Sequence, residues 1–139
     1  MSENLMKYFK DTVIKVNRDG SESKIGKLLD ERDDYIVVLT EEDGVVYYKT
    51  QHIKSFTENT KGKWEFDVEI PENFKNAEKF KDLLKSLKYH WVKINRGSSE
   101  MVKGVLCEVK DDFVHLVAKE ELVRIPIFHI NNVSYRSKN

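Results

Sequence analysis

The sequence has 139 residues, enough for one ordinary domain or two very small ones. It is 40% hydrophobic and 35% charged, which is typical of a folded, soluble protein and argues against a disordered one. The 24 basic residues equal the 24 acidic residues, whereas a general nucleic-acid binder usually carries a basic excess because phosphate contacts dominate its affinity.

The sequence also argues against a membrane-spanning protein and against a secreted one. No apolar run approaches the roughly 20 residues that span a bilayer, and residues 1–11 lack the apolar core of a secretory signal. We therefore expect no membrane span, no signal peptide and synthesis in a cytoplasm. Cys107 is the single cysteine, so neither an internal disulfide nor a thiolate zinc site can form.

In chain order, the first predicted series is a short helix followed by strands. The helix is represented by its last turns, with apolar Leu5, Met6 and Phe9. Strands are predicted where apolar and β-branched residues alternate or gather between turn signals. Their ranges are 12–18, 23–31, 34–42, 44–50 and 52–58.

A connecting segment and a second series follow. In residues 63–70, apolar and polar residues alternate, which predicts an extra strand or an extension of the preceding one. Residues 71–90 predict a helix, because Phe74, Ala77, Phe80, Leu84 and Leu87 fall three or four apart, with Pro71 in its first turn. The later strands are predicted at 90–96, 101–109, 112–120, 122–128 and 129–135.

The two series are similar in sequence, which indicates an internal duplication. Copy one runs from about residue 5 to 57, and copy two from about 83 to 134. Identical residues recur 78 positions apart, and 77 apart after one residue is dropped near Asp43. These pairs include Leu5 and Leu83, Lys15 and Lys93, Asn17 and Asn95, Arg18 and Arg96, Glu22 and Glu100, Gly26 and Gly104, and His52 and His129.

A helix followed by five short strands predicts a small, strongly bent antiparallel barrel. We therefore expect a mainly β protein with two tandem Sm-like or SH3-like barrels packed on each other, each preceded by a short helix. The expected boundaries are 1–57 for the first barrel, 58–73 for the connection and 74–139 for the helix and second barrel. Gly26 and Gly104 lie in the second strands, where glycine permits a sharp bend.

The stretches VNRDGSES (16–23) and INRGSSEM (94–101) lie between the first two strands of each copy. One interpretation is turn chemistry, with Arg and Glu pairing across the turn for at most about 1 kcal/mol. The other is an assembly or recognition turn that is built twice. The candidate residues are Asn17, Arg18, Glu22, Asn95, Arg96 and Glu100.

Other polar residues predict structural roles. The adjacent pairs Asp33–Asp34 and Asp111–Asp112 indicate solvated turns. His52 and His129 occupy equivalent positions, which favours a structural hydrogen bond. No nucleophile elbow, phosphate-binding glycine loop or spaced acid–base pair is present. We expect no enzyme activity, no cofactor and no metal site.

The motifs are similar to the spore coat protein B family of Bacillus-type spore formers. The family pattern is approximately Asn-Arg-Gly-Gly-Pro-Glu, a glycine, and a terminal His-Ile-Lys-Ser-Ile. Neither copy has the Gly-Gly-Pro turn, and the Ser/Lys/Arg-rich tail of many members is not found in this sequence. The matching residues are Asn17, Arg18, Glu22, Gly26, His52, Ile53, Lys54 and Ser55 in copy one, and Asn95, Arg96, Gly97, Glu100, Gly104, His129 and Ile130 in copy two.

The resemblance implies a structural, non-catalytic component of the spore coat, made in the mother-cell cytoplasm. The expected partners are other coat proteins and further copies of the chain, because small barrels often associate through exposed strand edges. The neutral charge and the acidic loops argue against nucleic acid, and no membrane partner is expected. The alternative is an Sm-like nucleic-acid-binding module that stacks bases on aromatic and guanidinium groups. Its candidates are Tyr47, Tyr48, Trp91 and Arg124.

Overall fold

The computed structural model describes residues 11–18, 20, 21, 23–59, 61, 64 and 66–135. These residues form ten antiparallel strands in one open sheet, one α-helix and two short 3-10 helices. The predicted mainly β class is therefore confirmed. The elements are β1 (Val13–Val16), β2 (Lys24–Glu31), β3 (Tyr35–Thr40), β4 (Gly44–Lys49), η1 (Thr50–His52), β5 (Phe56–Thr57), α2 (Phe80–Ser86), β6 (Trp91–Ile94), β7 (Val102–Val109), β8 (Phe113–Ala118), β9 (Glu121–Pro126), η2 (Ile127–His129) and β10 (Asn132–Tyr135).

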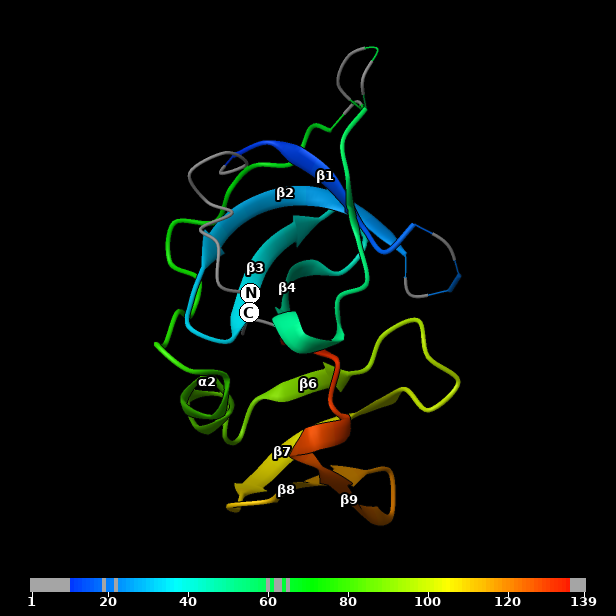
Figure 1. The fold of residues 1–139 in the computed structure, drawn as a ribbon. Helices are drawn as coiled ribbons and strands as arrows, with labels where there is room; N and C mark the ends of the chain where they lie inside the picture. The colour runs from blue at the N-terminus through cyan, green and yellow to red at the C-terminus, as the bar shows by residue number, and fades with distance from the viewer. Residues whose placement is uncertain are drawn as a thin grey trace.

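The sheet has the strand order β5-β1-β2-β3-β4-β10-β6-β7-β8-β9 (Figure 1). We refer to β1–β5 as the first half and to β6–β10 as the second half. In each half the fifth strand returns to pair with the first. The fourth strand of the first half, β4, then pairs with β10 of the second half, with Tyr47 opposite Val133. The two closed barrels are therefore not confirmed, because this pairing joins the described strands into one sheet.

The hydrophobic core has two parts that meet at β3. Ile36 and Val38 point into a cluster inside the first half. Tyr35, Val37 and Leu39, on the opposite face of the same strand, belong to a larger cluster that includes α2 and the interior of the second half. All six residues of β3 are buried as a result. In β8, only Val114 and Leu116 are buried, because its other face is not covered to the same extent.

The helix predicted over residues 71–90 is shorter than expected, and its predicted start is wrong. It begins at Phe80, and Lys79 is extended with φ −121° and ψ 155°. The backbone before it is held by the first half instead, since the Tyr35 hydroxyl donates to the Ala77 carbonyl and the Tyr47 hydroxyl to the Lys75 carbonyl. These long-range contacts override the helical periodicity. The helix predicted before the first strand lies outside the described residues.

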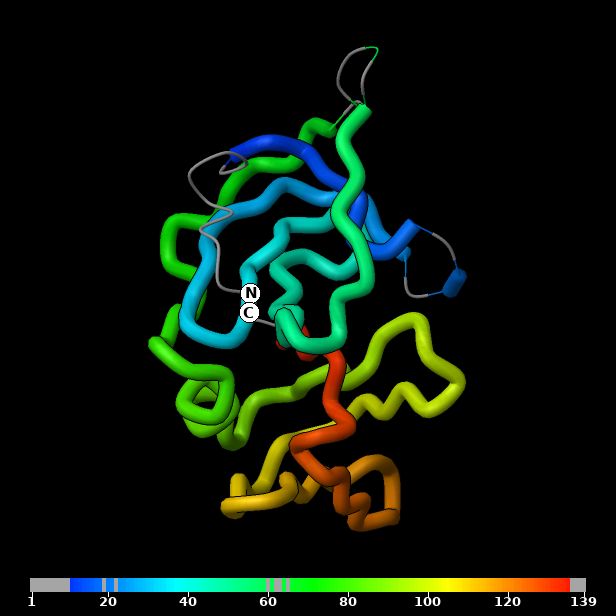
Figure 2. The backbone as a smooth tube through the Cα atoms, in the orientation of Figure 1, coloured from blue at the N-terminus to red at the C-terminus, as the bar shows by residue number. Residues whose placement is uncertain are grey.

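The connection between β5 and α2 passes along the outside of the first half before it reaches the second (Figure 2). Its described residues are 58, 59, 61, 64 and 66–79, and none of them is in a strand. The extra strand expected at 63–70 is therefore not found in the described part of that range. Phe66, Val68, Phe74 and Ala77 pack instead against the larger core cluster.

Several backbone features recur in both halves, 77 or 78 positions apart in the sequence. Asn17 and Asn95 both have a left-handed backbone, with φ 62° and 61°. The ladders β2–β3 and β7–β8 are each interrupted, after Leu28 and after Leu106. A 3-10 helix precedes the fifth strand in both halves.

The glycine of each second strand lies against the backbone of the third strand. A Cβ on Gly104 would collide with the Val117 carbonyl oxygen, and one on Gly26 would lie 2.6 Å from the Leu39 carbonyl oxygen. Close approach of the neighbouring backbone therefore requires glycine at these positions, which is a different reason from the predicted bend.

We predict that Gly104→Ala lowers the free energy of unfolding by about 1–3 kcal/mol, because the methyl group must displace strand backbone. Urea denaturation followed by circular dichroism measures the change. Lys103→Ala, at an exposed neighbouring position, is the control. Equal stability of the two variants would show that β7 and β8 can move apart to accommodate the methyl group without lowering the free energy of unfolding.

Candidate assembly site

Asn17 and Asn95 tie the end of the first strand in each half to the entry of the fifth strand. The Asn17 Oδ1 accepts a hydrogen bond from the Lys54 backbone N–H at 2.8 Å. The Asn95 Oδ1 accepts one from the Asn131 backbone N–H at 2.6 Å, and its Nδ2 donates to the His129 carbonyl at 3.1 Å. Asparagine suits this position because it tolerates a left-handed backbone and supplies local hydrogen bonds.

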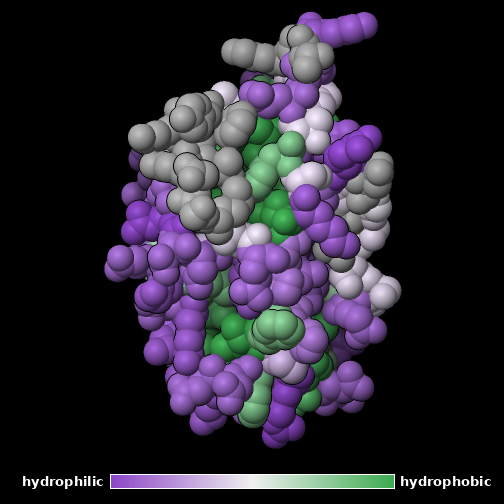
Figure 3. All heavy atoms as spheres, viewed as in Figure 1, coloured by the Kyte–Doolittle hydropathy of each residue, from purple (hydrophilic) through white to green (hydrophobic). Residues whose placement is uncertain are grey.

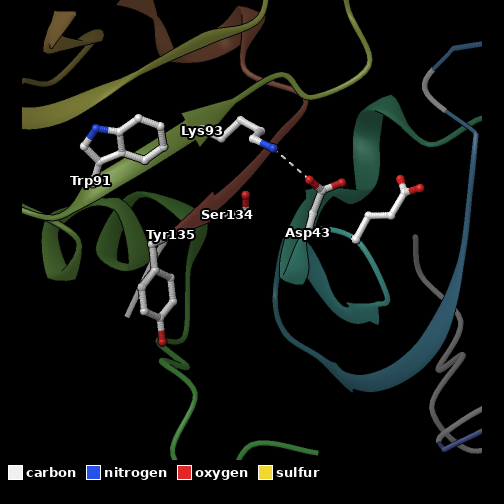
Figure 4. Close-up of a pocket in the computed structure, with 6 residues that line it drawn as sticks. Asp43, Trp91, Lys93, Ser134 and Tyr135 are labelled. Atoms are coloured by element: carbon white, nitrogen blue, oxygen red, sulfur yellow. Dashed lines mark hydrogen bonds and ion pairs between the residues drawn. The ribbon is translucent and has the colours of Figure 1, made fainter. Parts of the chain in front are cut away.

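Arg96, the residue after Asn95, belongs to a charged cluster between the two halves. We call this cluster of Asp43, Lys93 and Arg96 the Asp43 cluster. Asp43 lies in the turn just before β4, in the first half. Its Oδ1 is 2.8 Å from Lys93 Nζ, and its Oδ2 is 2.8 Å from Arg96 Nε. Figure 4 shows Asp43 and Lys93 pointing toward one another from the two halves. Each carboxylate oxygen therefore has a cationic partner from the second half.

The environment of Asp43 favours its charged form. Its side chain is only 9% exposed, and burial opposes ionisation. The hydrogen bond and charge of Lys93, together with the charge of Arg96, outweigh that effect and hold the pKa of Asp43 below its ordinary value of 3.8. The carboxylate is therefore ionised at neutral pH and connects the halves electrostatically.

The remaining candidate residues are placed differently. Arg96 pairs with Asp43 rather than with Glu100, so the predicted Arg–Glu pair across this turn is wrong. Arg18 is exposed; its backbone N–H donates to the Ser55 hydroxyl at 3.1 Å. Glu100 is exposed. Glu22 lies outside the described residues. Of the six candidates, the structure thus brings Arg96 to a group of the other half, while the bonds of Asn95 hold the entry of β10, the strand that pairs with β4.

A second group of contacts extends the junction. Lys49 is 7% exposed, and its Nζ donates to the Ile127 carbonyl of η2 at 2.7 Å. Burial lowers the pKa of this lysine. His52 Nε2 donates to the Phe128 carbonyl at 3.0 Å, so this histidine has a structural hydrogen bond across the halves. Desolvation raises the pKa of the buried Tyr35 hydroxyl to about 12.

Asp33 and Asp34 contact α2. Asp33 is exposed, as expected for a solvated turn, but Asp34 is partly buried and has a structural role. The Phe80 backbone N–H at the start of the helix donates to Asp34 Oδ1 at 2.7 Å. Asp33 pairs with Lys79 at 2.8 Å. Asp34 therefore caps a helix that begins 46 positions later in the chain. In the second copy, Asp111 pairs with Lys81 at 3.1 Å.

An open hollow of about 190 Å³ lies at the junction and is lined by Asp43 and Lys93 together with Trp91 and Tyr135 (Figure 4). Within the described part of the chain, no group of three or more His, Cys, Asp or Glu residues could hold a metal ion. No helix among these residues is both long enough and apolar enough to cross a membrane.

The nucleic-acid alternative depends on exposed aromatic groups. Tyr47 and Tyr48 are buried, so these two candidates are not available for base stacking.

Comparison with known proteins identifies one relationship. The chain is 36% identical over 125 residues, or 90% of its length, to spore coat protein B of Bacillus subtilis (strain 168). The chain is related to the spore coat protein B family. The predicted resemblance is therefore confirmed. The chain spans only 33% of the length of spore coat protein B. No family model and no solved structure matches the chain.

Two members of the Asp43 cluster were not among the predicted site residues. In the sequence, Asp43 marks the place where the spacing between matching residues changes, and Lys93 matches Lys15. The signal was nevertheless present, because both copies carry a lysine and an arginine around the repeated Asn and an acid just before the fourth strand. What the sequence could not show is that these charges meet between the halves.

We predict that Asn95→Ala is less stable than Asn95→Gly, and that both are less stable than the parent chain. Both variants lose the side-chain hydrogen bonds, but glycine adopts the left-handed backbone at no steric cost. The expected loss is about 1–3 kcal/mol for alanine. Urea unfolding of the three proteins checks the order. A glycine variant as unstable as the alanine variant would show that backbone strain has no part.

We predict that Asp43→Asn lowers the free energy of unfolding by about 1–2 kcal/mol at neutral pH, after allowance for solvent screening of partly exposed charges. Because the folded pKa lies below 3.8, this contribution is complete above the unfolded pKa and disappears as the pH falls through the folded value. Urea unfolding from pH 7 to pH 2.5 measures the difference between the two proteins.

The control for this experiment is Glu42→Gln, which removes the neighbouring, mostly exposed carboxylate that pairs with Lys24. We expect a smaller loss for this variant. A pH-independent difference between the parent chain and Asp43→Asn would contradict an ionic role for Asp43.

Proposed function

We propose that the chain is a structural, non-catalytic component of the spore coat that assembles through protein–protein contacts, with other coat proteins and with further copies of itself. The observation that carries the proposal is the similarity over 90% of the chain to a protein named spore coat protein B. The name supports a coat component. The architecture is the basis for inferring the non-catalytic role and the assembly.

The recurring architecture supports an origin by duplication. Both halves have the order fifth, first, second, third, fourth strand, and both have a left-handed asparagine after the first strand. We infer that each half is a small SH3-like or Sm-like unit, within the boundaries 1–57 and 74–139, and that residues 58–73 connect them. The pairing of β4 with β10 then represents association of two like units within one chain.

The use of charge at the junction supports a structural role. Both carboxylate oxygens of Asp43 are bound by cations of the other half, and Lys49 is bound to a backbone carbonyl of η2. These groups stabilise the contact between halves. The Sm-like nucleic-acid alternative has less support, because two of its four stacking candidates are buried.

Fusion of the chain to a fluorescent protein in its native spore former tests the proposed location. We expect fluorescence to gather around the forespore during sporulation and to remain with the coat fraction of purified spores. The control is the fluorescent protein alone under the same promoter. Signal that stays in the mother-cell cytoplasm and is absent from the coat fraction would refute a coat component.

A further inference from the structure

We propose that copies of this chain associate head to tail, with the β9 edge of one molecule adding to the β5 edge of the next. This proposal deepens the assembly part of the proposed function and rests on it. In the described residues, β5 and β9 are the two ends of the sheet, and each has a strand neighbour on one side only. Such edges present backbone donors and acceptors to a partner.

The chain already contains the contact that would be repeated. Within the molecule, the fourth strand of one half pairs with the fifth strand of the other, with Tyr47 opposite Val133. The strands left at the ends are a fifth strand, β5, and a fourth strand, β9. The spacing of 77 positions places Arg124 at the position of Tyr47 and Phe56 at the position of Val133. The intermolecular register would therefore place Arg124 opposite Phe56.

The charged residues of the Asp43 cluster have counterparts at the two ends of the sheet, and these counterparts are not paired with each other within the molecule. Asp43 immediately precedes β4, and Glu120 immediately precedes β9. Lys93 and Arg96 correspond to Lys15 and Arg18 at the spacing of 78. An acid thus lies at the β9 end of the chain, and the two cations that would bind it lie at the β5 end.

Two of these three groups, Glu120 and Arg18, are exposed in the described structure. Lys15 is partly buried, and its Nζ lies over the Trp64 ring, 5.6 Å from the ring centre. None of the three has an ion-pair partner among the described residues, whereas Asp43, Lys93 and Arg96 are all paired. The charges would meet only when the β9 end of one molecule reaches the β5 end of another.

The face of the sheet next to the β9 edge is apolar. The equivalent face in the first half is also apolar, and it is buried at the internal contact. Leu39 is 1% exposed, whereas its counterpart Val117 is 42% exposed. Val117 lies between Val105 and Leu122 in a row across three strands, and both of these residues are exposed as well. Figure 3 shows green surface among polar side chains in the lower part of the view, where Figure 1 places this half.

A difference in sequence makes the proposed contact weaker than the internal one. The Lys49 backbone N–H donates to the Asn131 carbonyl at 2.9 Å in the internal contact, but Pro126 occupies the position of Lys49 in β9 and has no N–H to donate. The intermolecular ladder is therefore shorter by one hydrogen bond. We expect reversible association that depends on protein concentration.

Sedimentation velocity over a range of concentrations tests the proposal with charge-reversal variants. Glu120→Lys alone, and the double variant Lys15→Glu with Arg18→Glu alone, are each expected to associate at least about tenfold more weakly than the parent chain, because like charges then face each other. Glu72→Lys, an exposed reversal in the connecting segment, is the control and is expected to associate normally.

Mixing the two variants gives the decisive result. The lysine introduced in one variant then faces the two glutamates introduced in the other, and the unchanged Glu120 of the second variant faces the unchanged Lys15 and Arg18 of the first. An equimolar mixture is therefore expected to regain assemblies of parental size. Circular dichroism of each variant verifies folding. A parent chain that is monomeric at all concentrations, or a mixture that stays dissociated while both variants are folded, would overturn the proposal.

These outcomes are separate from the test of coat location. A monomeric parent chain that still gathers in the coat fraction would reject head-to-tail association and leave a coat role through other proteins. A chain that associates as proposed but is absent from the coat would reject the coat role alone.

Discussion

The pairing of β4 with β10 is the constraint on which the rest of the structure depends. A strand has two edges, and β4 uses one for β3 and the other for the last strand of the second half. This brings the outer face of β3 against α2, so that strand is buried on both sides. The hydroxyl groups of Tyr35 and Tyr47 must then find acceptors, because a buried polar group without a partner is costly. They take the carbonyls of residues 75–77, and the helix starts only afterwards.

Equivalent positions in the two halves therefore have different environments. Asp43 is bound by two cations, while Glu120 is exposed at the same point of the second half. Leu39 is buried, while Val117 is largely exposed. The residue types are similar, so the difference arises from which half has a neighbour on its β4-type edge. That asymmetry is the physical basis for the proposed self-association.

The relationship to spore coat protein B concerns 33% of that relative's length. The described structure shows how the residues of this chain form one cohesive sheet. Backbone pairing supplies the geometry, a shared apolar cluster supplies the hydrophobic burial, and the Asp43 cluster fixes the relative position of the halves. Stable contacts of these three kinds are what the proposed structural role in the coat requires.

The sequence by itself predicted the ten strands that the structure contains, although it also predicted a strand at 63–70 that the described residues do not form. Alternation and turn residues act over a few neighbouring positions, so they can be read from the sequence. The sequence also singled out Asn95 and Arg96 among its six candidate residues. It did not determine the partner of Arg96, the start of α2 at Phe80 or the capping role of Asp34. Those depend on which strand edges meet across the chain, and only the tertiary structure decides that, because such contacts join residues far apart in sequence.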